Sequence, residues 1–415
     1  MHRALISELI KHGHEVTMIT AYTLEPLKLG SNYTEILIEP VYDAWKAANE
    51  HHGTNSLYEM DMKPAFLMKM MEAQGVATTE HALKQAKVQA IINAKQTEGV
   101  YDLLLAEQFR QDAFLALAHV YKIPVVCSAT FAKQLYMSQM FGLITPWSYV
   151  SSNCLPLRDR MNFWQRIYNT YAAIEMDFHR EFSYFPKMDA LVEKYFGHLP
   201  SKDFLVFNKN DCEITYCYVI VVSISHKLYY YKLTYRFSVF LSNLHYFFTV
   251  QFPSVSAMQR NLSAMFINNY TPLAAATPTI DSIVNVGGIH IYPPKPLPAD
   301  LQKFLDEAKD GAIYFSFGTQ VQAKDMPLEK LHLFLDVFRQ LKQRVLWKFE
   351  NDSIPNLPAN VLIKKWLPQN DILAHPNVRV FITHGGLFGT QEAVYHGVPV
   401  LGMPFFFDQV NMLLN

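Results

Sequence analysis

The sequence predicts an α/β protein of two domains, each built on a parallel sheet, and three observations predict this class. A chain of 415 residues, 50% of them hydrophobic, can bury two cores of ordinary domain size. Short apolar strands alternate with amphipathic helices along most of the chain. A stiff proline-rich stretch, YPPKPLP at residues 292–298, interrupts that alternation, so we expect a linker there between the two domains.

Charge and cysteine content argue against two classes of function. The 36 Lys and Arg residues nearly balance the 37 Asp and Glu residues, and no basic stripe is interleaved with aromatic residues. The cysteines are spaced unlike any usual metal site and are too few for a disulfide scaffold. They are Cys127, Cys154, Cys212 and Cys217. We therefore expect neither a nucleic-acid partner nor a bound metal.

The chain opens with a predicted helix at residues 1–11, where Leu5 and Leu9 recur at helical spacing. Gly13 ends this helix, and EVTMIT at residues 15–20 predicts a strand. No basic start is followed by a long apolar core, so no signal peptide is expected in this sequence. Because an α/β chain usually begins on a strand, we expect a first strand upstream of residue 1.

The rest of the first half predicts a parallel sheet with one segment of unusual composition. Apolar strands are expected at 101–109 and 123–129 around a helix at 112–121, a further helix at 162–178, and strands at 263–269 and 282–291. Residues 205–250 are instead rich in tyrosine and β-branched residues, with hardly a glycine or proline. Their unbroken apolar runs are far shorter than the ~20 residues that span a bilayer, so we expect no transmembrane helix.

After the linker the alternation of helix and strand resumes. Strands are expected at 311–319, 344–350, 361–368, 378–383 and 398–404, with helices at 299–308, 328–341, 371–375 and 390–397. Such units form parallel sheets with right-handed crossovers, and ligands bind at the carboxyl ends of their strands. This places four loops around one crevice, at residues 318–319, 366–369, 384–389 and 408–409.

One of these loops has the properties of a phosphate site. HGGLFG at residues 384–389 joins a strand to a helix expected to begin near Thr390, so its amides and the helix dipole favour an anion. Glycines 385, 386 and 389 let the backbone approach that anion. His384 can donate to a phosphate oxygen, and Glu392, expected on the first helical turn, suits a sugar diol. A tight structural turn would explain the glycines alone equally well; the four loops together favour a nucleotide.

From WLPQNDILAHP to FFFDQ, at residues 366–376 and 405–409, the chain resembles the animal UDP-glycosyltransferases that transfer glucose or glucuronic acid. The resemblance covers most of residues 1–204 and 253–415. It implies the GT-B fold, two Rossmann-like domains facing a cleft, with acceptor-binding residues 1–291 and UDP-sugar-binding residues 299–415. Here the first strand and the C-terminal helices of the family would lie outside the sequence. Residues 205–250 match nothing in the family. Two origins would explain this, a genuine insertion or a translated intron.

The resemblance also assigns roles in the donor site. Trp366 would stack on uracil, with an ordinary buried aromatic as the alternative, and Gln369 would bond the uridine. Glu392 would hold the ribose hydroxyls. The expected pyrophosphate ligands are Thr319, His384 and the glycine loop with Gly386 and the Gly389 amide; the expected sugar ligands are Asp408 and Gln409. UDP-glucose or UDP-glucuronic acid would be a co-substrate, with no other cofactor and no metal.

In the implied reaction an acceptor hydroxyl attacks the anomeric carbon in line with the departing UDP. This reaction needs a base for the hydroxyl and stabilisation of the leaving group. In the family a histidine at the end of the first strand is the base, and a carboxylate orients it. That carboxylate matches Glu107, with Asp112 as the alternative. The position of the base falls before Met1. His2 is expected inside the first helix, and His14 in a turn.

Two functions of different classes therefore remain. The first is a UDP-glycosyltransferase acting on small lipophilic acceptors with inversion, which by resemblance would sit on the lumenal side of the endoplasmic reticulum membrane through a C-terminal helix missing here. The second is a catalytically inactive product that at most binds UDP-sugar. A nicotinamide-dependent dehydrogenase would need GxGxxG after an early strand and an acid about twenty residues later, and the sequence has neither.

Overall fold

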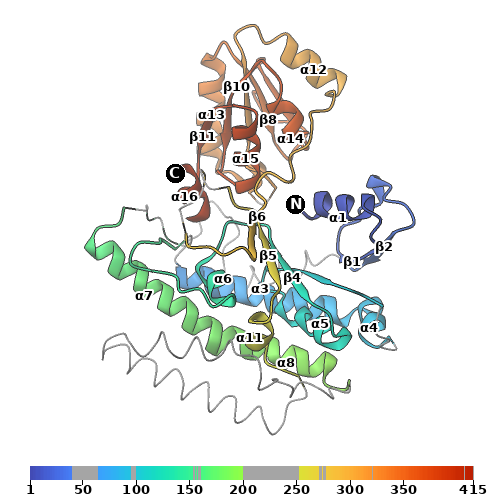
Figure 1. Ribbon diagram of the computed structural model, residues 1–415. Coiled ribbons are helices and arrows are strands. Elements are labelled where there is room, and N and C mark those ends of the chain that lie inside the picture. Colours follow the sequence, from blue (N-terminus) through green and yellow to red (C-terminus); the bar gives the residue numbers. More distant parts are fainter. Residues whose placement is uncertain are drawn as a thin grey trace.

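The computed structural model confirms an α/β architecture built on parallel strands (Figure 1). The described strands form sheets in the orders β1-β2, β3-β4-β5-β6 and β11-β10-β7-β8-β9. The segment 205–250, expected to be an unmatched insert, lies outside the described residues. Those described are 1–39, 64–94, 100–152, 155, 157, 160–199, 252–270, 273, 277–319, 321–405 and 407–414.

The N-terminal elements form a small unit of their own. Helix α1 (His2–Lys11) leads through Gly13, whose φ is +87°, into β1 (Val16–Thr20), as expected from the sequence. β1 pairs in parallel with β2 (Tyr33–Leu37), with Val16 opposite Tyr33. Within the described residues this pair is separate from the four-stranded sheet, and Figure 1 shows it to one side of that sheet.

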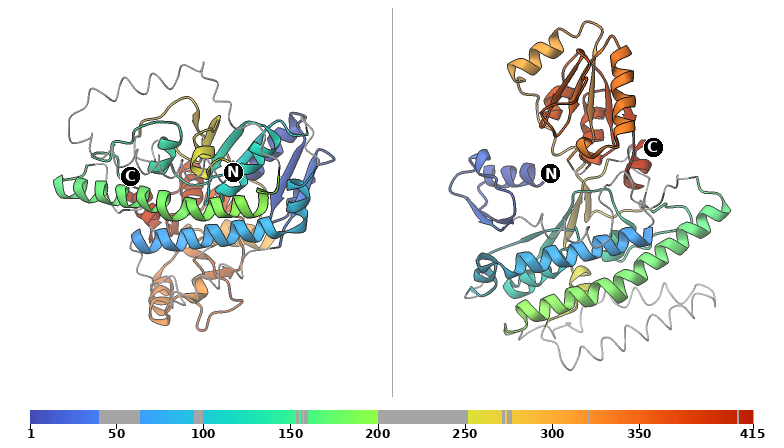
Figure 2. Two further views of the ribbon diagram at one scale, coloured as in Figure 1. Left: turned by 90° about the horizontal axis from the view of Figure 1, so that it is seen from below. Right: turned by 180° about the vertical axis from the view of Figure 1, so that it is seen from behind.

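The four-stranded sheet contains the predicted apolar strands. They are β3 (Leu104–Glu107), β4 (Val125–Ala129), β5 (Ala264–Ile267) and β6 (Ile283–Asn285). Its helices are α3 (Pro64–Lys84), α4 (Ala86–Ile92), the 3-10 turn η2 (Asp112–Leu115), α5 (Ala116–Tyr121), α6 (Leu135–Met140), α7 (Phe163–His179), α8 (Phe185–Phe196) and α11 (Val255–Gln259). Figure 2 shows α3 beside the long α7–α8 run on one side of this sheet.

Helix α3 was not predicted, and Gly75 in its middle shows why it is hard to predict. A Cβ on Gly75 would lie 2.4 Å from the Arg110 Cβ and 2.7 Å from its carbonyl oxygen. Thr79 donates a hydrogen bond to that same carbonyl at 3.3 Å. Glycine is unfavourable within a helix, but here it lets α3 pass close to another backbone segment, a tertiary reason that local sequence does not display.

The third sheet also follows the predicted alternation. Its strands are β7 (Ala312–Ser316), β8 (Arg344–Lys348), β9 (Val361–Lys364), β10 (Val378–Thr383) and β11 (Val400–Gly402), and its helical segments are α12 (Ala299–Asp306), η5 (Ala323–Asp325), α13 (Leu328–Gln340), α14 (Gln369–Leu373), α15 (Leu387–Tyr395) and α16 (Phe407–Leu414). From β7 the chain moves outward to β8 and β9, then returns to the other side of β7 with β10 and β11. The order therefore reverses beside β7, where such sheets open a crevice.

The start of α15 differs from the prediction. The helix begins at Leu387, not near Thr390, so Gly389 lies in its first turn and Glu392 in its second. Gly386 is the N-cap with φ −63° and ψ 140°, and its carbonyl oxygen accepts hydrogen bonds from both the N–H and the hydroxyl of Thr390. These bonds continue the helix through Gly389, which the sequence pattern placed in the loop.

The segment from β6 to α12 includes the expected proline stretch and is tied to α14. The Asn370 side-chain amide donates to the Tyr292 carbonyl oxygen at 3.0 Å, and the Lys295 N–H donates to Asp371 Oδ1 at 2.9 Å. At its start, a Cβ on Gly287 would lie 2.4 Å from the Asn269 carbonyl oxygen. The path of this segment is therefore fixed at both ends.

None of the helices in the described part of the chain is both long enough and apolar enough to cross a bilayer.

Candidate functional site

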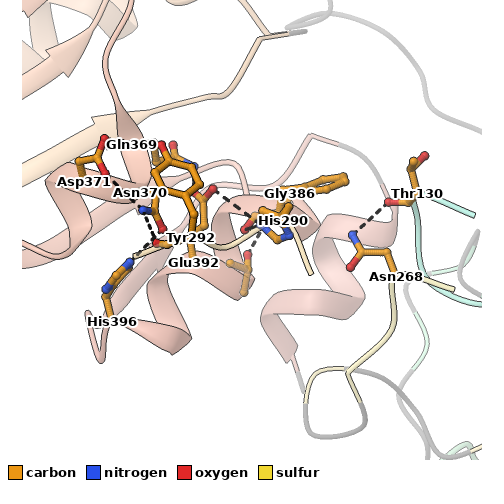
Figure 3. A network of polar contacts seen from close by, with 12 residues as sticks. Thr130, Asn268, His290, Tyr292, Gln369, Asn370, Asp371, Gly386, Glu392 and His396 are labelled. Carbon is orange, nitrogen blue, oxygen red and sulfur yellow. Dashed lines mark hydrogen bonds and ion pairs between the residues drawn. The ribbon is translucent and has the colours of Figure 1, made fainter. Parts of the chain in front are cut away.

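The loops predicted to bind a nucleotide lie where β7, β9 and β10 end at the carboxyl edge of the third sheet. Trp366 and Gln369 follow β9, His384 follows β10, and Thr319 follows β7. Figure 3 shows the polar network at this edge, where Gln369 and Glu392 meet His290 and Tyr292 from the segment before α12. The sequence argument from strand ends therefore places three of its four loops at this edge, whereas residues 408–409 lie in α16.

Gln369 and Glu392, predicted to contact uridine and ribose, are in direct contact. Gln369 Nε2 donates to Glu392 Oε2 at 2.6 Å, and Gln369 Oε1 accepts from the hydroxyl of the buried Tyr314 on β7 at 3.2 Å. This chain of hydrogen bonds fixes the orientation of the Gln369 amide. Burial raises the pKa of the Glu392 carboxyl, and the hydrogen bond from Gln369 partly opposes this.

His384 lies between two glycines that leave room for its ring. A Cβ on Gly318 would lie 2.8 Å from His384 Cε1, and a Cβ on Gly386 would lie 2.6 Å from both Cε1 and Nε2. Burial lowers the pKa of His384 to about 4, so the ring is neutral at neutral pH. Thr383 Oγ1 lies 3.4 Å from Nδ1. A hydroxyl donating to Nδ1 leaves the proton on Nε2, which can then donate to an anion.

Trp366 is 71% exposed, although tryptophan is usually well buried. The alternative that it is an ordinary buried aromatic is therefore wrong, and an indole face is free for stacking. Thr319 is also exposed, in the turn after β7. Gly389 lies against the Gln369 side chain, since a Cβ there would be 3.0 Å from Gln369 Nε2. The glycine thus leaves space for Gln369 as well as exposing the first turn of α15.

Asp408 and Gln409 lie in α16 and not in a loop. Gln409 is 5% exposed, and its Oε1 accepts a hydrogen bond from the Phe405 N–H at 2.8 Å. That oxygen therefore holds the turn before the helix. The side chain of Asp408 lies outside the described residues.

In the four-stranded sheet, Glu107 is the last residue of β3 and accepts a hydrogen bond from Thr130 Oγ1 at 3.1 Å. His2, inside α1 as expected, places Nε2 2.8 Å from Ser128 Oγ on the neighbouring strand. Burial lowers the pKa of His2, while the Glu107 carboxylate acts to raise it. Figure 3 shows Thr130 together with Asn268, which donates to the Thr130 carbonyl oxygen at 3.2 Å.

Asp112, the alternative to Glu107, is enclosed by internal hydrogen bonds. Its Oδ1 accepts from Gln108 Nε2 at 2.6 Å and from Gln259 Nε2 at 2.5 Å, and its Oδ2 accepts from the Tyr184 hydroxyl. The carboxylate is 5% exposed. Both oxygens are thus used to join η2, α11 and the π-helical stretch Arg180–Tyr184 between α7 and α8, which is a structural arrangement.

His290 belongs to this site and was missed by the sequence analysis, which took GGIHI as strand. Its Nε2 lies 3.4 Å from the Phe388 carbonyl oxygen and 3.7 Å from Glu392 Oε1. The usable signal was a histidine two residues after Gly288 and just before the proline stretch. In the described part of the chain, no three His, Cys, Asp or Glu side chains are grouped so as to hold a metal ion.

Comparison with known proteins identifies the family. The model of a family described as "UDP-glucoronosyl and UDP-glucosyl transferase" matches residues 1–219 and 217–413. The chain belongs to this UDP-glycosyltransferase family. UDP-glycosyltransferase UGT5 of Dactylopius coccus is 30% identical over 407 residues, which are 98% of this chain and 66% of that protein. UDP-glucosyltransferase 2 of the same species is 43% identical over 169 residues, 41% of this chain and 33% of that protein.

A mammalian relative agrees with this membership, and two solved structures share the fold. UDP-glucuronosyltransferase 2B14 of Oryctolagus cuniculus is 27% identical over 98% of this chain and 68% of its own length. The chain thus spans between one third and about two thirds of these relatives. The kitacinnamycin glycotransferase has a TM-score of 0.53 at 14% identity, over 99% of this chain and 79% of its own. Arabidopsis thaliana UGT89C1 complexed with UDP has a TM-score of 0.51 at 13% identity, over 99% and 78%. The fold is GT-B.

Proposed function

We propose that this protein binds a UDP-sugar through residues 299–415 and transfers the sugar, with inversion, to a small lipophilic acceptor held by residues 1–291. The observation that carries the proposal is the hydrogen-bonded pair of Gln369 and Glu392 beside the exposed Trp366. An aromatic face, an amide and a carboxylate together suit a base, its polar edge and a ribose diol. The relatives named as UDP-glucosyl- and UDP-glucuronosyltransferases support the choice of donor.

UDP is stabilised as a leaving group by neutral donors in this proposal. The Nε2–H of His384, the exposed Thr319 and the free amides in the first turn of α15, including that of Gly389, would surround the pyrophosphate. Such preorganised donors stabilise charge as it develops on the departing oxygen. UDP-glucose or UDP-glucuronic acid is the proposed co-substrate, with Asp408 and Gln409 as the proposed sugar ligands and no further cofactor.

At the acceptor, the hydroxyl oxygen forms a bond to the anomeric carbon while the bond from that carbon to UDP breaks, and the hydroxyl proton passes to a base. We propose that Glu107 is the carboxylate that orients this base. Both oxygens of Asp112 already accept internal hydrogen bonds, from Gln108, Gln259 and Tyr184. The acceptor class is supported by the structure of UGT89C1 complexed with quercetin, a solved structure with a TM-score of 0.51 to this chain. Attachment to the lumenal face of the endoplasmic reticulum membrane is proposed from the resemblance to the family.

Titration calorimetry with UDP tests the donor site. Trp366→Ala should weaken binding by ~1 to 3 kcal/mol, the usual value of base stacking on an aromatic side chain. Trp164→Ala is a matched control, because Trp164 on α7 is 73% exposed and lies outside the proposed site. If the two variants bound UDP with equal affinity, the proposed stacking role of Trp366 would be wrong. A wild-type protein that bound no UDP would overturn the proposed function.

Turnover of UDP-glucose and UDP-glucuronic acid with a panel of phenols tests the transfer step. Product above a no-enzyme control supports the transferase. UDP binding without product in any combination would reduce the function to UDP-sugar binding, the second hypothesis from the sequence.

A further inference from the structure

The side chain of His290 is placed like part of a binding site, although it comes from the segment that joins the second and third sheets. It is 10% exposed, and its ring packs edge-on against Phe388 with centroids 4.6 Å apart. Nε2 faces two oxygen acceptors, the Phe388 carbonyl at 3.4 Å and Glu392 Oε1 at 3.7 Å. Nδ1 is buried and has no hydrogen-bond partner among the described residues.

These contacts determine which ring nitrogen carries the proton. Burial lowers the pKa of His290 to about 4, so the ring is neutral and has one N–H. Both neighbouring oxygens lie on the Nε2 side, and neither can donate to it. The proton is therefore on Nε2, where it donates to the Phe388 carbonyl and points a positive dipole toward Glu392.

Glu392 is consequently restrained from two directions. On one side Gln369, which belongs to α14, donates through Nε2 to Glu392 Oε2 at 2.6 Å. On the other side His290 faces Glu392 Oε1. A carboxylate that is 13% exposed and free to rotate would bind a diol poorly, because its rotamer would have to be fixed on binding. With Gln369 and His290 on either side, the Glu392 carboxylate is held in one orientation before the ligand arrives.

The position of His290 is itself secured. Three consecutive residues of α14 make the bonds that matter here. Gln369 donates to Glu392, Asn370 donates to the Tyr292 carbonyl oxygen, and Asp371 accepts from the Lys295 N–H. His396 completes this arrangement, with Nε2 3.0 Å from Asn370 Oδ1 (Figure 3). The same short helix thus fixes both the carboxylate and the segment that carries His290.

We propose that His290 is a positioning residue for the Glu392 carboxylate, so that the segment joining the two sheets forms part of the ribose pocket and contributes to selection of a ribonucleotide. This inference rests on the proposed function. It predicts that His290 affects recognition of the ribose hydroxyls through Glu392, while stacking of uracil and binding of the diphosphate remain.

The experiment compares UDP with 2′,3′-dideoxy-UDP in calorimetry on the full chain. Wild type should prefer UDP. His290→Phe keeps a ring against Phe388 but has no N–H, and should reduce that preference about three- to tenfold, the coupling expected within one hydrogen-bond network. His290→Gln supplies an N–H near the Nε2 position and should restore most of the preference. His332→Phe, the same substitution at an exposed histidine on α13 outside this network, should leave it unchanged.

In a Glu392→Ala background, His290→Phe should have no further effect on the ratio of the two affinities. Two results would overturn the inference while the UDP site stands. One is a His290→Phe variant that keeps the full preference for UDP over 2′,3′-dideoxy-UDP. The other is a His290→Phe effect on this preference that is as large in the Glu392→Ala background as in wild type. Failure of wild type to bind either nucleotide would overturn the inference together with the proposed function. Thermal unfolding of each variant shows whether a lost preference for UDP arises from misfolding. If His290→Phe is misfolded, the comparison of His290→Gln with wild type decides.

Discussion

Replacing Gly318 by alanine should displace His384 and weaken UDP binding by about tenfold or more. The added Cβ would lie 2.8 Å from His384 Cε1, so the ring must retreat by roughly 0.7 Å to reach an ordinary carbon–carbon contact of about 3.5 Å. A hydrogen bond of about 2.9 Å from Nε2 to a phosphate oxygen would lengthen beyond the range of a real hydrogen bond. A hydrogen bond to a charged group contributes ~1.5 to 3 kcal/mol, which corresponds to a loss of about 10- to 150-fold in affinity.

Gly397→Ala is the matched control for this change. Gly318 and Gly397 have φ values of +77° and +69°, so alanine costs a similar ~1 to 2 kcal/mol of backbone strain at either position. A Cβ on Gly397 would meet nothing within 4 Å. Both variants should therefore lose similar thermal stability, and only Gly318→Ala should lose UDP affinity in calorimetry. If the two variants bound UDP within twofold of each other, the role of His384 at the pyrophosphate would be refuted.

Three further outcomes are expected. Asp112→Ala should destabilise the fold by ~3 kcal/mol or more, measured by urea unfolding, because it leaves three side-chain donors without their shared acceptor; a loss below 1 kcal/mol would contradict this. His384 has a folded pKa of about 4 against an ordinary 6.5, so the unfolded chain takes up a proton that the folded chain does not, and stability falls as pH falls from 6.5 toward 4. His384→Gln should make that fall shallower by at most ~1.4 kcal/mol per pH unit, and an unchanged slope in thermal melts from pH 7 to 4.5 would count against the buried neutral ring. Deletion of residues 205–250 should leave a soluble protein, because the rings of Phe196 and Phe252 that flank the segment are 6.1 Å apart and a short loop can join them; lower solubility than the parent would argue that the segment is a genuine part of the protein.

The succession of strands along the chain and the position of most donor loops could be predicted because both depend on local signals. Apolar runs such as VRVFIT are bounded by turn residues, and their length and β-branched content mark them as buried parallel strands. Once the strands are known, the rule that ligands bind at carboxyl ends places Trp366, Gln369 and His384 without knowledge of packing. The same rule placed Glu107 at a strand end.

What could not be predicted depends on contacts between distant segments. Gly75 looks like a helix breaker until Arg110 is seen against it, and Gly389 looks like loop until the Gly386 carbonyl is seen to extend the helix. Asp112 and Glu107 are both acids near one strand end, and only the three donors around Asp112 separate them. The glycine pair and the proline stretch on either side of His290 do not reveal its partners Glu392 and Phe388, which lie about a hundred residues later.

The order of the third sheet has a consequence for when the protein becomes able to bind nucleotide during folding. β7, β8 and β9 pair with neighbours that follow each other along the chain, whereas β10 must return past all of them to pair with β7, with Thr383 opposite Ser316. His384 reaches Gly318, and Glu392 reaches Gln369, only when this last pairing has formed. Closing such a long loop is slow compared with local pairing. Nucleotide binding therefore reports the docking of β10, and a ligand at this site should slow hydrogen exchange of the β10 amides, far along the strand from any atom it touches.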